Sequence, residues 1–369
     1  MKSFIRQEIA LPVGLLTLLF FKTLGSDLLT ETTPFAVYLP VSLALLAIVT
    51  WAIFSVVRHS DALAIKLGEP FGTLILTLSV ISLEVVMISS VMLTGEPNPT
   101  MARDTMFAVV MLVTNGLVGF TLLFGGWRYH TQNFNLDGVK SYLVAIIPLA
   151  LLCLVLPNFT QGGTLGGTLG GLSKAMSWML IIISILLYGV FLLIQTRSHS
   201  HFFVDSDHED HEDHHGPLQS NVYHTLLLLA YLVVVILLAK TLAIPINYGV
   251  YVMEAPAALG GFIVACIVLA PEAVGAIKAA FNNQLQRAMN LYFGSVLATI
   301  ALTVPSVLFI GALMGQEVRL GLSPADMVLL VTTLMVCKVT FSSGRTHALH
   351  GATHLVLFVV YLFLMFEHG

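Results

Sequence analysis

The sequence predicts an all-α polytopic membrane protein. Hydrophobic residues make up 57% of the 369 residues and charged residues only 10%, and the mean hydropathy is +0.92. A soluble protein of this length would carry charges on about a quarter of its residues. The net charge of -4 offers no basic surface for nucleic acid. The sequence shows neither a nucleophile with a matching base nor a soluble catalytic domain, so we expect a protein that is not an enzyme.

Eleven apolar segments approach the length of about 20 residues that a helix needs to cross a bilayer. They cover residues 8–24, 35–57, 71–95, 105–127, 139–157, 175–195, 222–246, 251–277, 288–313, 325–343 and 348–366. The first is predicted to be a retained helix, because Leu24-Gly-Ser-Asp27 is a poor signal-peptide cleavage site. Cys153, Cys266 and Cys337 all lie in apolar runs, which is typical of packing residues.

The basic residues predict the orientation of these helices. With a cytoplasmic N-terminus, ten Lys and Arg residues fall on the inner side and four on the outer side. The inner set is Lys2, Arg6, Arg58, Lys66, Arg128, Lys140, Arg197, Lys278, Arg287 and Arg345, and the outer set is Lys22, Arg103, Lys174 and Arg319. Because cytoplasmic loops carry the excess of positive charge, we expect the N-terminus inside and the C-terminus outside.

The spacing of the segments predicts four regions. An N-terminal transmembrane helix (1–30) precedes a first group of five helices (31–195), an acidic His-rich cytoplasmic loop (196–221) and a second group of five (222–369). Because five is odd, the two groups would have opposite orientations in the membrane. Two inverted five-helix repeats are typical of secondary transporters.

Two glutamates lie inside the apolar segments, one in each half of the chain. Glu84 is thirteen positions after Phe71, which places it about 20 Å into a hydrocarbon core about 30 Å thick. Glu272 follows Pro271 in the run that starts at Val268. An ionised carboxylate at this depth costs roughly 2.5 kcal/mol or more, so such acids indicate a functional ion site, although a satisfied structural acid is the alternative.

Several stretches in the right order carry a family resemblance. They are Leu67–Leu76 leading to Glu84, Glu272–Asn283 followed by Gly294-Ser295 and Pro305, Leu187-Tyr188 with Gln195–Arg197 and His199, and Phe341–Gly351. In these stretches the chain resembles the cation/proton exchanger family of the calcium/cation antiporter superfamily, most closely its bacterial ChaA type. The resemblance covers nearly the whole chain after the first helix.

The resemblance implies a cation site between the repeats, with Glu84 and Glu272 as metal ligands that bind the cation and protons in alternation. The family's Gly-Asn-Ala stretch before each glutamate is replaced here by Val80-Ile81-Ser82 and Val268-Leu269-Ala270. Two amide ligands are therefore absent, whereas calcium prefers six to eight oxygens. Hydroxyl and amide side chains on the following helices are candidates to supply oxygens: Thr114, Asn115, Ser295 and Thr299.

The implied function is exchange of cytoplasmic Ca²⁺ for protons by alternating access, in the inner membrane of a bacterium. An Na⁺ or K⁺/H⁺ antiporter with the same site is the alternative, and a passive cation channel is a weaker one because no filter-like segment is visible. We expect no cofactor, membrane lipid as the surrounding partner, and no nucleic acid. The oligomeric state stays open, with a homo-oligomer as one alternative.

Further polar residues have both a functional and a structural interpretation. Glu69 and Glu254 precede the two glutamate-bearing helices, where they either line the approach to the site or interact with a helix N-terminus. His347, His350 and His354 recur at helical spacing and are candidates for proton relay or for packing. The loop side chains His208, Asp210, His211, Asp213, His214 and His215 form either a regulatory cation site or a solvated linker. A third function class, a metal sensor, would depend on this loop.

Overall fold

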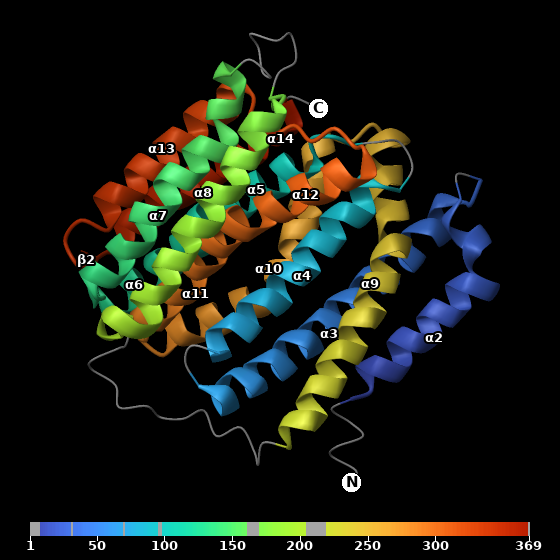
Figure 1. Cartoon of the computed structure of the whole chain (residues 1–369), viewed down its shortest axis with the longest axis horizontal. Coiled ribbons are helices and arrows are strands. Elements are labelled where there is room, and N and C mark those ends of the chain that lie inside the picture. Colours follow the sequence, from blue (N-terminus) through green and yellow to red (C-terminus); the bar gives the residue numbers. More distant parts are fainter. Residues whose placement is uncertain are drawn as a thin grey trace. The chain divides into compact units, whose positions relative to one another are not determined.

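The structure is a computed structural model, and it describes residues 8–30, 32–68, 71–94, 98–160, 170–203 and 219–367. Nearly all of these residues are helical (Figure 1). The α-helices are α2 (Ala10–Thr23), α3 (Phe35–Leu67), α4 (Phe71–Met92), α5 (Met101–Met111), α6 (Val118–Tyr129), α7 (Leu136–Leu154), α8 (Lys174–Leu193), α9 (Asn221–Tyr251), α10 (Ala257–Phe281), α11 (Leu285–Ala298), α12 (Val304–Met314), α13 (Pro324–Thr340) and α14 (Ala348–Glu367). Short π-helical segments, η2 (Leu112–Leu117), η5 (Ile194–Ser198) and η7 (Thr299–Thr303), continue or join α-helices. The 3₁₀ turns are η1 (Ser26–Leu29), η3 (Leu156–Phe159) and η6 (Ser200–Phe202).

The predicted all-α membrane fold is confirmed, and each of the eleven apolar segments coincides with a helix. Within the described residues, nine helices are long and apolar enough to cross a membrane. With 14 and 17 residues, α2 and α13 are shorter than a full crossing. The helix α3 is longer than predicted, because the polar stretch after its apolar run stays helical up to Leu67. It ends at Gly68, which has a φ of +63° that favours glycine.

The chain divides into two compact units, one made of Met1–Asn98 with His215–Pro271 and the other of Pro99–His214 with Glu272–Gly369. In the first unit, α3, α4 and α9 pack against one another, and α2 lies against α3 and α9 (Figure 1). Glycines allow two close approaches: a Cβ on Gly14 of α2 would overlap Val234 of α9, and one on Gly72 of α4 would overlap the Ala64 carbonyl of α3. Helices in membranes associate closely through such small residues.

The second unit contains α5 to α8 and α11 to α14. Its α6 packs on α14, α7 on α11, and α8 on α12. Strand β1 (Gln132–Asn133), which follows α6, pairs antiparallel with β2 (Arg345–Thr346), which precedes α14, in the register Gln132↔Thr346 and Asn133↔Arg345. This short ribbon fixes one end of the α6 and α14 pair.

Glycine also determines how closely α6 and α14 pack. A Cβ on Gly351 of α14 would overlap the backbone of Leu123 and of Gly119 on α6, and one on Gly126 of α6 would overlap the backbone of Ala348. Because backbone atoms cannot rotate away as side chains do, any larger residue at these positions has to move a helix. The glycines therefore set the separation of the two helices.

We predict that Gly351→Ala lowers the stability of the folded protein by about 1–3 kcal/mol through this overpacking. The measurement is the thermal unfolding midpoint of the detergent-solubilised protein. Gly189→Ala on α8 is the matched control, because a Cβ there has no neighbour within 4 Å. Its effect should stay within about 1 kcal/mol, with alanine the better helix former. Equal midpoints for the Gly351 variant and wild type would contradict the predicted close contact.

Candidate functional site

Glu84 lies on the buried face of α4, and its exposure is 2%. The neighbours one turn away on this face are apolar, among them Val80, Ile81, Met87 and Ile88. The same helix exposes Leu78 and Ser82 on its other side. The carboxylate is therefore held inside the first unit, about 20 Å along α4 from the start of the helix.

Glu272 lies in α10 and is half-buried. The preceding residue, Pro271, is inside the helix and has no N–H to donate to the carbonyl of Ile267. The Oγ of Ser295 on α11 donates a hydrogen bond to Oε2 of Glu272. The structure thus brings together two of the predicted site residues, both in the second unit.

The Ser295 hydroxyl has two acceptors within reach. Besides Oε2 of Glu272, its Oγ lies 2.9 Å from the carbonyl oxygen of Leu291 in its own helix. A hydroxyl has a single hydrogen but two acceptor lone pairs. It can therefore donate to an ionised Glu272, or accept from a protonated Glu272 and donate to Leu291. Both charge states of the carboxyl group find a partner without any helix moving.

Three further predicted residues lie in π-helical segments. Thr114 and Asn115 are in η2, and Thr299, four residues after Ser295, begins η7. All three are buried, and η2 packs against α11. Single π-helical turns inside α-helices occur frequently at functional sites, because the wider turn frees backbone groups from regular bonding.

The polar atoms of Asn115 take part in a buried network. Its Oδ1 lies 3.0 Å from Nδ1 of His354, and its Nδ2 donates to Oγ1 of Thr333 at 2.8 Å. Nε2 of His354 is 3.1 Å from Oγ1 of Thr340. Because the amide oxygen accepts, Nδ1 of His354 carries the hydrogen. Asn115 therefore joins η2 to α13 and α14, and its oxygen already has a donor.

The three histidines at helical spacing on α14 and just before it have different surroundings. His354 is fully buried and bonds across helices, whereas His347 and His350 stack on each other with ring centroids 4.0 Å apart. Thr333 and Thr340 complete the network, and neither was among the predicted site residues. The helical spacing of the three histidines was the one available signal for it, because the contacting threonines lie on another helix.

Glu84 belongs to the first unit, and Thr114 donates to the carbonyl of Val110 in its own helix. Glu254 is exposed in the turn before α10. Glu69 lies outside the described residues, as do the loop residues His208, Asp210, His211, Asp213, His214 and His215. Within the part of the chain that the structure describes, no three His, Cys, Asp or Glu side chains are grouped as a metal site.

The fold is similar to that of two solved exchangers. Native YfkE superimposes with a TM-score of 0.72 at 19% identity, covering 98% of this chain and 99% of that chain. The H⁺/Ca²⁺ exchanger CAX gives a TM-score of 0.66 at 12% identity, covering 98% of this chain and 89% of that chain. At these identities the likeness concerns the fold.

Sequence comparison identifies the family. The chain is 47% identical over 335 residues to the sodium-potassium/proton antiporter ChaA of Escherichia coli strain K12, covering 88% of both chains. It is 24% identical over 267 residues to the Ca²⁺/H⁺ antiporter of Aphanothece halophytica, covering 68% of this chain and 70% of that one. The sodium/calcium exchanger protein family matches residues 37–197 and 223–367. The chain therefore belongs to the sodium/calcium exchanger protein family.

Proposed function

We propose that this protein exchanges a cytoplasmic metal cation for protons across the membrane, with the carboxylates of Glu84 and Glu272 as the groups that bind both. The observation that carries the proposal is a carboxylate inside a candidate membrane-spanning helix in each half of the chain, buried at Glu84 and half-buried at Glu272. Family membership and the name of the 47% identical relative, a cation/proton antiporter, support it.

Exchange follows from the cost of charge in the membrane. A bare carboxylate away from water is unfavourable, whereas a protonated carboxyl group and a carboxylate with a bound cation both avoid the uncompensated charge. Proton and cation then compete for the same oxygens. Loading from one side and release to the other, with the helices moving in between, couples the two flows.

The Ser295 hydroxyl supports both halves of this cycle. Because it can donate to Glu272 or accept from it, the carboxyl group keeps a hydrogen-bond partner when it is ionised and when it is protonated. A fixed cationic partner would instead favour the ionised state alone. A neutral, reversible partner suits a group that has to gain and lose a proton in each cycle.

Two observations bear on the transported cation. The relative with 47% identity is named for sodium and potassium, and the chain lacks the two amide ligands before its glutamates. Relatives at 23–24% identity are named as Ca²⁺/H⁺ antiporters. From the sequence alone, Ca²⁺ is the first expectation. The 47% identity to the sodium-potassium/proton antiporter of Escherichia coli instead favours Na⁺ or K⁺ as the cation, with Ca²⁺ as the second candidate.

We further propose that the chain is built from two inverted five-helix repeats, with the N-terminus in the cytoplasm. The helix α3 would correspond to α9, α4 to α10, and α7 to α13. The continuous helices Met101–Tyr129 and Leu285–Met314 support this, because each contains an internal π-helical segment, η2 or η7. The excess of basic residues in the inner loops supports the orientation.

We predict that Glu84→Gln and Glu272→Gln each abolish exchange, because an amide neither carries the exchanged proton nor neutralises a cation. The measurement is dissipation of a pH gradient in inverted membrane vesicles on addition of Na⁺, K⁺ or Ca²⁺. Glu317→Gln is the matched control, because this carboxylate lies on an exposed loop and pairs with Arg319. Wild-type exchange in either substituted protein would show that the acid is structural.

We predict that Ser295→Ala raises the cation concentration for half-maximal exchange about tenfold, which corresponds to about 1.4 kcal/mol for a lost hydrogen bond to a charged group. Concentration dependence in the same vesicles measures it. Ser306→Ala on α12 is the control, because that hydroxyl donates to the carbonyl of Leu302 in its own helix. If the two alanine variants behave alike, Ser295 has no part in binding.

The cation itself is determined by adding each chloride salt separately to wild-type vesicles. We expect Na⁺ and K⁺ to collapse the pH gradient at lower concentrations than Ca²⁺. A response to Ca²⁺ at a lower concentration than to either monovalent ion would reverse the preference. Cation entry into the vesicles that leaves the pH gradient unchanged would instead indicate a passive channel.

A further inference from the structure

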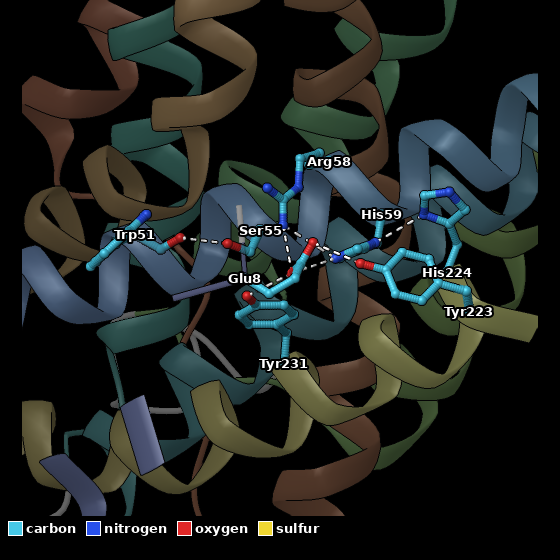
Figure 2. Close-up of polar contacts among 8 residues, drawn as sticks. All are labelled: Glu8, Trp51, Ser55, Arg58, His59, Tyr223, His224 and Tyr231. Atoms are coloured by element: carbon cyan, nitrogen blue, oxygen red, sulfur yellow. Dashed lines mark hydrogen bonds and ion pairs between the residues drawn. The ribbon is translucent and has the colours of Figure 1, made fainter. Parts of the chain in front are cut away.

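A half-buried carboxylate other than the transport glutamates lies at the start of the first unit. Glu8, just before α2, is bound by side chains from two other helices (Figure 2). From α3, Nη2 of Arg58 donates to Oε2 of Glu8 at 2.8 Å, and Nε2 of His59 lies 3.2 Å from the same oxygen. From α9, Tyr231 donates to Oε2 and Tyr223 to Oε1, both at 3.0 Å. Glu8 thus connects α3 and α9.

Glu8 stays ionised over the whole physiological range. Burial raises the pKa of Glu8, but hydrogen bonds from His59 and Tyr231 and the positive charge of Arg58 outweigh this and hold the pKa at about 2. Its contribution to stability is complete above its ordinary value of 4.5 and is lost only as the pH falls through about 2. Any change of protonation in this cluster near neutral pH therefore has to occur on a group other than Glu8.

The ionised carboxylate determines where His59 carries its hydrogen. Nη2 of Arg58 lies 3.3 Å from Nε2 of His59 but makes its shorter contact, at 2.8 Å, with Oε2 of Glu8. An ionised carboxylate only accepts, so we assign the hydrogen on Nε2 of His59 to the bond with Glu8. In the neutral ring Nδ1 is then an acceptor. This Nδ1 lies 3.0 Å from Nδ1 of His224 on α9, and the two rings are buried with centroids 5.3 Å apart (Figure 2). His224 consequently donates from its Nδ1.

The opposite nitrogen of His224 is the position at which a further proton binds. With Nδ1 donating, Nε2 of neutral His224 has a free lone pair, and this buried atom has no hydrogen-bond partner among the described residues. One added proton there leaves every hydrogen bond in place. A second added proton would have to bind Nδ1 of His59. Both facing Nδ1 atoms would then carry hydrogen, so the hydrogen bond between them would break.

The charges around the pair limit it to one extra proton. On α3, Arg58 and Lys66 are positive, and Lys66 acts electrostatically on His224. Glu8 supplies the negative charge, and Tyr223 and Tyr231 of α9 pack on the ring of His59. The two other helices of this group, α2 and α4, each carry one charged residue, Lys22 and Glu84. Glu8 is already paired with Arg58, so each extra proton adds an uncompensated positive charge, and the second proton also meets the charge of the first.

We propose that His59 and His224 form a proton-binding site, separate from the transport glutamates, that holds the start of α9 on α3 and releases it when the second extra proton binds. The site lies on the side of the membrane that the basic residues predict to be cytoplasmic, so it would respond to cytoplasmic acidification.

Release of this contact would reach the helix that carries Glu84. In the first unit α4 packs against both α3 and α9, the two helices that the histidine pair joins. Separating them removes support from two sides of α4. This consequence for transport rests on the proposed function, whereas the proton-binding site itself does not.

The direct test is magnetic resonance of the full-length protein in lipid bilayers with ¹⁵N-labelled histidine. We expect a hydrogen-bond coupling between two imidazole nitrogens at alkaline pH that is lost on acidification. His224→Gln should abolish the coupling. Glutamine still offers an N–H to His59, so the fold should be kept. His201→Gln, at an exposed histidine, is the matched control and should leave the coupling unchanged.

A second measurement follows the helices themselves. Spin labels on cysteines introduced at Ile65 of α3 and Val222 of α9, both exposed, report the separation of these helix ends by electron paramagnetic resonance. We expect the separation to increase on acidification in the wild-type background and to stay constant with His224→Gln. Absence of the nitrogen coupling at every pH, or an equal increase in both backgrounds, would overturn the proposal. Neither measurement depends on transport, so a failure of exchange would be seen separately.

Discussion

The cost of placing a carboxylate in a membrane is the constraint on which the rest of this structure depends. Hydrocarbon offers no water, so each buried acid needs a proton, a cation or a set of donors. The protein places Glu84 and Glu272 on helices whose other residues are almost entirely apolar. Packing within each unit holds these two acids, and Ser295 bonds to Glu272. In our proposal the transported ions supply the compensating charge. In our proposal, the need for compensation is what couples proton and cation.

A comparison of two carboxylates in the same chain shows what the surroundings decide. Glu8 has a guanidinium, an imidazole and two phenols as donors, and its charge is fixed at physiological pH. Glu272 has a serine hydroxyl, which can donate or accept and so favours neither state strongly. In our proposal, strong donors make Glu8 a structural tie between helices, whereas an adaptable neutral partner leaves Glu272 able to exchange its proton. Both residues are glutamates, so the difference between them comes from the neighbouring side chains.

Buried polar networks also tie together helices that apolar contacts alone would leave free to slide. In the second unit, Asn115 and His354 join the π-helical segment η2 to α13 and α14. In the first unit, Glu8 and the pair of His59 and His224 join α3 to α9. Because lipid is as apolar as leucine, hydrogen bonds and close glycine contacts specify which helix faces meet in a membrane protein. Where such a network contains histidine, the same bonds that specify the packing can also respond to protons.

The sequence alone determined the helices and the places of the two acids along them, because both follow from local composition. A run of about 20 apolar residues has few stable options besides a spanning helix, and counting along it gives the position of Glu84 or Glu272. The tertiary structure decided which polar groups meet. Ser295 lies 23 positions from Glu272, and Glu8 lies 51 from His59 and 223 from Tyr231. Asn115, predicted as a ligand, has its oxygen bonded to His354, which lies 239 positions away. Helical periodicity relates residues within one helix, but contacts between helices depend on how faces pack, and no local pattern records that.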